Sequence, residues 1–414
     1  MKLSVLRLLV VALVCGSAIM LFTSARAQKS PVNQSFTVSL SSLGIAAPMQ
    51  TPAAAAAPQE KTVEQTRKNI QVLKGLPDSQ LGTVMNFVAV SLGRRCDFCH
   101  VNNAGTWIWE SDDKPEKVTA RKMMTMTLAL NKDNFKGSPT VSCYTCHRGR
   151  STPQGIPSFP LPTPPPPRQQ PPAQAAPGQP AAAPTPTPVP PPTSDQILAK
   201  YIEGVGGQPA IDKMKTFVMK GTYTGVNGAA LPYEVDLAAP DKFYINVTAQ
   251  QGTVERGFDG KAGWQKTSQG VIELGNPVLD DLKSTFVLYR NIKLKEQFAQ
   301  MRFGGRDKIG DRNVLVINGR TADNHRERLY FDAETGLLLR RLSFMETPIG
   351  VIPNQVDFED YRDVDGVKVP FTVKVSSVEP GLVSTRKYTE IKLNAPVDDA
   401  KFNKPAGTAK PATP

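Results

Sequence analysis

The sequence has 414 residues, and its 49 Lys and Arg against 37 Asp and Glu give a formal net charge of +12 at pH 7. Its 37 prolines are nearly twice the usage of about 5% in an average protein, so part of the length is not folded domain. Only three histidines are present, which excludes chemistry that needs several histidine ligands or a histidine-rich active site.

The N-terminus has the pattern of an export signal. Lys2 and Arg7 precede the apolar run 8–22, and Ala25-Arg26-Ala27 fits a small-x-small cleavage site. We therefore expect residues 1–27 to be a signal peptide and the mature protein to be periplasmic. Because the uncharged stretch is long enough to span a bilayer, an uncleaved membrane anchor is the alternative.

Composition divides the remaining chain into five parts. Residues 153–192 contain 18 prolines in 40 residues, so this stretch cannot bury a core and is expected to be an extended, semi-rigid spacer. The predicted parts are an Ala/Pro-rich flexible lead (28–59), a cytochrome domain (60–152), a Pro-rich linker (153–194), a β-rich C-terminal domain (195–405) and a tail (406–414).

The region 60–152 has mainly helical patterns. One helix is expected over 61–74, ending at Gly75, and a second over 79–92, where apolar residues recur on one face. A third begins at Asp113, which has capping-box spacing to Glu116, and runs to about residue 131. No strand pattern of comparable strength is present, so this region is expected to be mostly α.

Two cysteine motifs carry the chemistry of this region. They read Cys96-Asp97-Phe98-Cys99-His100 and Cys143-Tyr144-Thr145-Cys146-His147. In Cys-x-x-Cys-His, two thiols can add to the vinyl groups of a haem and the adjacent histidine can become an iron ligand. The sequence therefore predicts two covalently attached haem c groups and redox chemistry.

Three alternatives compete for these cysteines. Paired Cys-x-x-Cys motifs can form a structural zinc site, a thioredoxin-like redox pair or simple disulfides, which an oxidising compartment permits. None of the three requires a histidine directly after both pairs, and two of the three histidines in the chain stand there.

Elimination reduces the number of residues that could be the remaining axial ligands. After His100 and His147 only His325 is left, beyond the Pro-rich linker, so two bis-histidine haems cannot form within one chain. Methionine is the natural alternative and raises the haem potential. Since helical methionines usually serve core packing, the residues alone leave four candidates open: Met85, Met123, Met124 and Met126.

Two segments carry a family likeness. One runs from Met85 to Cys96, and the other has the pattern Arg-x-Met-x-x-Met-Thr, which starts at Arg121 and leads to the second motif. Both resemble the cytochrome subunit of photosynthetic reaction centres, in which a helix before each haem donates a methionine ligand. The resemblance implies that Met85 serves the first haem and Met123 the second. The family subunit typically carries four haems, whereas this chain has two motifs.

The C-terminal domain is expected to be an antiparallel β structure with one or two helices, because short β-branched and aromatic runs alternate with turn signals such as Asp259-Gly260 and Asp365-Gly366. A helix is expected over 195–205. The phrases at 258–264, 330–337 and 358–361 resemble the lipoprotein-carrier half-barrel superfamily, in which a curved sheet can hold an acyl chain.

Three functions follow from these patterns. The leading one is a periplasmic dihaem electron carrier, not an enzyme, whose redox partner is a reaction centre or a respiratory complex. The others are a β domain that binds a lipid or membrane-associated ligand while the haems sense redox state, and a dihaem peroxidase-like enzyme. Export and the four propionates of two haems reduce the charge to about +5, so basicity does not point to nucleic acid.

Overall fold

The computed structural model describes residues 60–406 except 154, 156–189, 226–227, 251, 276–278, 280–281, 284, 287–290 and 379–382. The predicted signal peptide, flexible lead and most of the linker and tail therefore lie outside the described residues. Residues Gln59–Pro414 form one compact unit. Among the helices that are described, none combines the length and apolar character of a membrane span.

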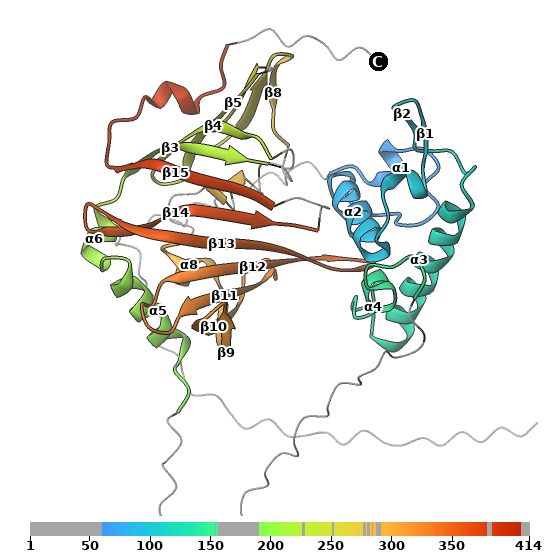
Figure 1. Cartoon of the computed structure of the whole chain (residues 1–414), viewed down its shortest axis with the longest axis horizontal. Helices are drawn as coiled ribbons and strands as arrows, with labels where there is room; N and C mark the ends of the chain where they lie inside the picture. The colour runs from blue at the N-terminus through green and yellow to red at the C-terminus, as the bar shows by residue number, and fades with distance from the viewer. Residues whose placement is uncertain are drawn as a thin grey trace, which may run out of the picture. The chain divides into compact units, whose positions relative to one another are not determined.

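The N-terminal part of this unit consists of short helices and one small hairpin (Figure 1). Its longest element, α3, spans Pro115–Asn134. The other elements are α1 (Val63–Thr66), η1 (Asp78–Gln80), α2 (Leu81–Leu92), η2 (Cys96–Phe98), β1 (Val101–Asn103), β2 (Thr106–Ile108) and α4 (Cys143–His147).

Helix α2 confirms the expected second helix. Its buried side chains include Val84, Phe87 and Val88, which recur at helical spacing and fill one face. Gly93 ends the helix in the left-handed conformation with φ 60°, and its amide bonds to the carbonyls of Ala89 and Val90. This is the C-terminal stop that glycine provides without steric cost.

The helix expected over 61–74 was wrong in length, because α1 ends at Thr66. Tertiary hydrogen bonds hold the following residues out of a helix. The Asn69 side chain donates to the carbonyl of Glu110 at 2.6 Å, and the backbone of Asn69 has φ 56°. The contact joins residues 41 apart in sequence, so no local pattern announces it.

Two further expectations need correction. The third helix begins at Pro115 rather than Asp113, because the Asp113 carboxylate accepts from the Ser111 hydroxyl at 2.7 Å instead of capping the helix. The β1–β2 hairpin was not expected, since each strand has three residues. Its turn is tight: Ala104 and Gly105 have φ 49° and 93°, as a two-residue hairpin turn requires.

The C-terminal part contains a sheet of thirteen antiparallel strands in the order β8-β7-β6-β5-β4-β3-β15-β14-β13-β12-β11-β10-β9. The expected antiparallel β architecture is thus confirmed, and the predicted turns at Asp259-Gly260 and Asp365-Gly366 join consecutive strands. The strands are β3 (Thr216–Thr224), β4 (Ala230–Ala238), β5 (Lys242–Ala249), β6 (Gly252–Phe258), β7 (Gly263–Thr267), β8 (Gly270–Glu273), β9 (Gln300–Ile309), β10 (Arg312–Arg320), β11 (Arg326–Asp332), β12 (Leu338–Thr347), β13 (Gly350–Val364), β14 (Val367–Ser376) and β15 (Val383–Leu393).

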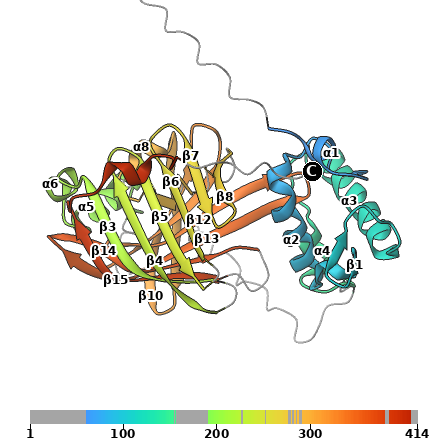
Figure 2. The same cartoon turned by 90° about the horizontal axis from the view of Figure 1, so that it is seen from above.

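The strands of this sheet that come first and last in the chain, β3 and β15, pair with each other in the middle of the sheet. The two halves of the meander, β4–β8 and β9–β14, therefore flank a central pair whose members are far apart in the chain (Figures 1 and 2).

Helices cover part of the sheet. Helix α5 (Ser194–Gly204) matches the expected helix, and Thr193 and Gln196 form a capping box at its start. Ile197, Leu198 and Tyr201 of α5 join the same buried apolar cluster as residues from most strands. The other helical elements are α6 (Gln208–Asp212), α8 (Leu294–Gln297) and η3 (Asp399–Phe402).

Candidate functional site

The first cysteine motif forms a tight turn shortly after α2. Cys96 accepts backbone hydrogen bonds from Cys99 at 3.2 Å and from His100 at 2.9 Å. Cys96 is exposed, while Cys99 and His100 are half-buried. The turn thus presents both thiols and the imidazole from a five-residue segment.

The second motif is helix α4. Ser142 caps it, and the amide of Ser142 donates back to the Thr145 hydroxyl at 3.0 Å. The Asn131 side chain of α3 fixes the approach to this helix by bonding both the carbonyl and the amide of Val141 at 2.8 Å. At the other end, Nδ1 of His147 lies 3.0 Å from the carbonyl oxygen of Arg150. If Nδ1 donates in this contact, Nε2 is left as a lone-pair donor for iron.

The two motifs are held together by contacts at their ends. The amide of Gly149 donates to the carbonyl of Ser91 at 2.8 Å. A Cβ placed on Gly93 would lie 2.1 Å from the Gly149 oxygen, so only glycine permits this approach. Gly93 precedes Cys96 by three residues and Gly149 follows His147 by two. The contact therefore brings the end of the second motif next to the start of the first.

The candidate methionines differ in their surroundings. Met124 is 8% exposed and belongs to a buried apolar cluster, so it is a core residue. Met123 and Met126 are 44% and 47% exposed and stay open as ligands. Met85 is half-buried and packs on the same cluster as Cys143. The structure thus removes one of the four candidates.

An uncovered apolar stripe tests whether these residues fit a haem. Met123, Met126 and Leu130 stand at i, i+3 and i+7 on α3, and each is more than a third exposed. Tyr144, inside the second motif, is 51% exposed. Exposed apolar side chains along one helix face call for a covering partner, and a haem would be such a partner.

The four cysteines of the two motifs are free thiols. Cys96, Cys99, Cys143 and Cys146 form no disulfide. Within the described ranges, no three His, Cys, Asp or Glu residues converge on one point, whereas a zinc site built from the four thiols would need such a cluster. In the described part of the chain the four thiols therefore remain as two separate pairs, one in each motif.

Burial sets the protonation of the reactive groups. It lowers the pKa of His100, and the nearby Lys117 cation lowers it further, so the imidazole is neutral at pH 7. Burial also raises the pKa of the thiols of Cys99 and Cys143. A neutral imidazole keeps the lone pair that iron requires.

Two tryptophans adjoin the first motif. Trp109 meets the His100 ring edge-on at 5.0 Å between centroids and stacks on Trp107 at 4.7 Å. Trp109 is 52% exposed, so it is not a core residue. A cleft of about 470 Å³ beside the first motif is lined by the cations of Arg94, Arg95 and Lys114 and by the carboxylates of Asp97 and Glu116.

His325 stays apart from both motifs. It is solvent-exposed, and its Nε2 lies 3.1 Å from the carboxylate of Asp323 in the turn before β11. His325 is thus a solvated residue of a turn.

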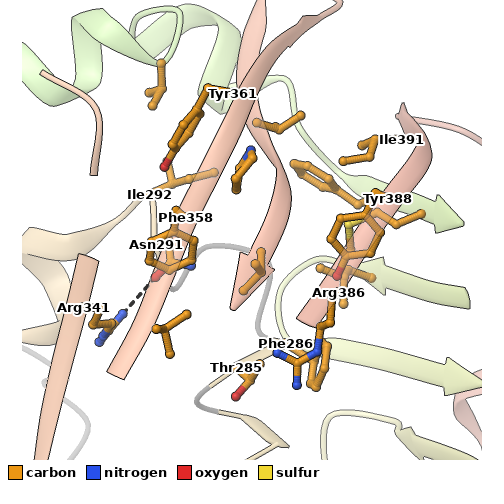
Figure 3. Close-up of a pocket in the computed structure, with 18 of the residues that line it drawn as sticks. Thr285, Phe286, Asn291, Ile292, Arg341, Phe358, Tyr361, Arg386, Tyr388 and Ile391 are labelled. Atoms are coloured by element: carbon orange, nitrogen blue, oxygen red, sulfur yellow. Dashed lines mark hydrogen bonds between the residues drawn. The ribbon is translucent and has the colours of Figure 1, made fainter. Parts of the chain in front are cut away.

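The C-terminal part contains a cavity of about 170 Å³ on the face of the sheet that α5 covers. Most of its lining is apolar or aromatic, and Figure 3 shows Tyr361 and Tyr388 among the residues around it. The lining side chains come from α5 and from strands β3, β4 and β12–β15 as well as the segment 285–292.

Two arginines give the cavity its polar character. Arg341 is buried and paired with Glu327 at 2.6 Å, and it also donates to Asn291 at 3.1 Å (Figure 3). Arg386 lies 5.2 Å from the centre of the Phe286 ring, and its Nε and Nη1 have no hydrogen-bond acceptor among the described residues. Sequence reasoning missed both, because neither stands in a local motif.

Comparison with known proteins agrees with the chemistry of the first region. Residues 32–185 match the family described as photosynthetic reaction centre cytochrome C subunit. This match covers the two cysteine motifs and both helices that carry the candidate methionines.

Individual relatives show the same likeness. The reaction centre cytochrome c subunit of Thermochromatium tepidum is 37% identical over 91 residues, which are 21% of this chain and 22% of the relative. Cytochrome c-554 of Chloroflexus aurantiacus is 33% identical over 98 residues, 22% of each chain. The chain thus spans about a fifth of the length of these relatives.

Two solved structures each cover about half of this chain. A LolA superfamily protein from Nitrosomonas europaea is 14% identical with a TM-score of 0.37, covering 51% of this chain and 98% of that one. A DUF1329 family protein from Desulfovibrio piger is 9% identical with a TM-score of 0.39, covering 50% and 96%.

Proposed function

We propose that the protein is an exported c-type cytochrome that carries two covalently attached haems and transfers single electrons between redox proteins. The observation that carries this proposal is the contact between Ser91 and Gly149, which brings two Cys-x-x-Cys-His motifs side by side in a region similar to reaction centre cytochromes. Adjacent one-electron centres suit electron relay.

Each residue of the two motifs has a role in this proposal. Cys96 and Cys99 anchor one haem, and Cys143 and Cys146 anchor the other. His100 and His147 would bind iron, and Met85 and Met123 would be further iron ligands, the first for the haem at Cys96 and Cys99 and the second for the haem at Cys143 and Cys146. The bound haem supplies a one-electron iron couple. The chain orients the imidazoles, through Arg150 for His147 and Trp109 for His100.

The proposed location is the periplasm, where covalent attachment prevents loss of the cofactor. The proposed partner is a reaction centre or a respiratory complex. A methionine ligand on each haem would leave no open site for peroxide, and this favours an electron carrier over a peroxidase-like enzyme.

The test is expression in a host that attaches haem c, followed by mass spectrometry of the intact protein and spectroscopy of the reduced form. We expect two haem adducts, a Met–iron charge-transfer band and no reaction with carbon monoxide. The variants Cys99→Ala and Cys146→Ala should each alter attachment at one motif. A metal-bound protein with no covalent haem would contradict the proposal.

The cavity favours a second function, binding of an anionic amphiphile such as a lipid by the C-terminal domain. Its apolar walls suit a hydrocarbon chain, and the unpaired nitrogens of Arg386 suit an anionic headgroup. In this proposal the ligand is held by burial of apolar surface and oriented by one charge-assisted hydrogen bond.

This second function is tested by displacement of a fluorescent fatty acid from the full chain. Arg386→Gln should weaken binding about tenfold, which is the loss of one charge-assisted hydrogen bond. Arg302→Gln, on the edge strand β9, is the matched control and should leave binding unchanged. Equal binding by the wild type and Arg386→Gln would remove the headgroup role.

A further inference from the structure

A buried apolar cluster joins the two halves of the chain. It contains side chains from α1, α2 and α3 together with two isoleucines of the β12–β13 hairpin. Ile349 is 0% and Ile352 is 2% exposed, as well covered as Val63 and Val84 of the helical region. The buried members are Val63, Leu73, Leu76, Val84, Phe87, Val88, Met124, Ile349 and Ile352.

The tip of the hairpin makes a close backbone contact with the helices. Thr347 pairs with Gly350 at the end of the ladder, and its hydroxyl donates to the Gly350 carbonyl at 2.7 Å. A Cβ on Gly350 would lie 2.8 Å from the Phe87 ring and 2.8 Å from Cβ of Ser142. The hairpin backbone therefore fits directly between α2 and the start of α4.

The residues that the hairpin contacts are next to predicted haem ligands. Phe87 follows Met85 by two residues on α2, and Ser142 immediately precedes Cys143. Met124, in the same cluster, follows Met123 on α3. Movement of the hairpin would therefore change the packing behind three elements that hold the second motif and its surroundings.

We propose that the hairpin tip Thr347–Ile352 is an intramolecular docking element, whose partner is the helical region of the same chain. Docked, it packs against α2, α3 and the residue that precedes α4, behind the second motif. A haem held by that motif would meet more water when the hairpin is released, and its reduction potential would fall because water stabilises the more highly charged ferric state. The potential change rests on the proposed cytochrome function, whereas docking does not.

Docking is tested with the full-length holoprotein carrying a protease recognition sequence between residues 160 and 185. After cleavage, the wild-type halves should co-elute on gel filtration at micromolar concentration. The double variant Ile349→Asp/Ile352→Asp should separate under the same conditions, with association at least tenfold weaker. Ile272→Asp, an equivalent substitution at an exposed position of β8, should co-elute.

The potential is measured by redox titration of the same uncleaved variants, with far-UV circular dichroism as the check on folding. The double variant should keep its β signal and shift one potential downward, while Ile272→Asp should shift neither. Separation of the cleaved wild-type halves would overturn docking, and unchanged potentials in a released variant would overturn its effect on the haem. Co-elution of halves that carry no haem would support docking and contradict the cytochrome proposal instead.

Discussion

At the scale of single residues, the three methionines of α3 show how burial separates similar candidates. They lie within four positions, but Met124 points into the core while Met123 and Met126 are exposed. Family likeness favours Met123 over Met126, although the two side chains are similarly exposed.

Substitution of Met123 by Ala should keep both haems attached and lower one reduction potential, because a thioether ligand stabilises ferrous iron. Met85→Ala should lower the other potential in the same way. The measurement is a redox titration with the Met–iron band as a second signal. Met126→Ala is the matched control, since it lies on the same helix with similar exposure; a shift there and none at Met123 would reverse the assignment.

Asp332 shows how one carboxylate can fix a turn. It is 4% exposed, and its Oδ1 accepts from the amides of Glu334 at 2.9 Å and Thr335 at 2.7 Å. Arg312 lies 2.9 Å from its other oxygen. Burial raises the pKa of Asp332, but the bonds to Thr335 and the Arg312 cation outweigh this and leave the pKa below its ordinary value.

Because the folded-state pKa is lowered, Asp332 stabilises the protein above pH 4 and this contribution is lost as the pH falls through the folded-state pKa. Asp332→Ala should reduce the free energy of unfolding by about 2–3 kcal/mol at pH 7, since buried donors lose their acceptor. Urea unfolding at pH 7 and at pH 3 checks this. The difference between wild type and variant should shrink at low pH, and a constant difference would contradict the carboxylate's role.

At the scale of elements, Gly93 ends α2 and also permits the contact between the two motifs. A side chain there would need the left-handed conformation and would overlap Gly149. Gly82, on the same helix, has no heavy atom within 4 Å of the place where a Cβ would stand.

Gly93→Ala should destabilise the protein by about 2–4 kcal/mol, from left-handed strain plus displacement of the second motif. Gly82→Ala should instead stabilise it by about 0.5–1 kcal/mol, because alanine restricts the unfolded chain within a helix. Chemical denaturation of both variants gives the comparison. Equal effects of the two substitutions would show that the Gly93–Gly149 approach is unimportant.

Elements with a local cause were predictable from sequence. Helix α2 followed from its apolar periodicity and Gly93, and the antiparallel β architecture of the C-terminal part followed from β-branched runs between turns. The length of α1 and the β1–β2 hairpin were not predictable, because the first depends on a distant partner of Asn69 and the second has strands of three residues.

The candidate site also has a part that the sequence predicts and a part that it does not. The cysteine motifs are contiguous, so the sequence identifies them without the fold. Their adjacency depends on the contact between Ser91 and Gly149. Arg341 and Arg386 come to line the same cavity only after the sheet has formed. Contacts of this kind combine residues that have no shared pattern along the chain.

At the scale of the whole molecule, the pairing of β3 with β15 makes the end of the chain a central part of the sheet. Loss of β15 would leave β3 and β14 as unpaired edges in the middle of thirteen strands. The segment after β15 contributes separately: Phe402 is 0% exposed, and its carbonyl accepts from the Trp264 indole at 2.8 Å.

The loss of stability on C-terminal truncation should therefore increase with the length that is removed. A chain ending at Ala406 serves as the reference. Ending at Leu393 removes the buried Phe402 and should cost about 3–5 kcal/mol of unfolding free energy, as large aromatic deletions do. Ending at Ser376 removes β15 as well and should prevent folding of the sheet, because apolar faces on both sides of the gap lose their cover. Soluble yield and far-UV circular dichroism distinguish these outcomes, and a folded, soluble chain ending at Ser376 would show that β3–β15 pairing does not hold the two halves of the sheet together.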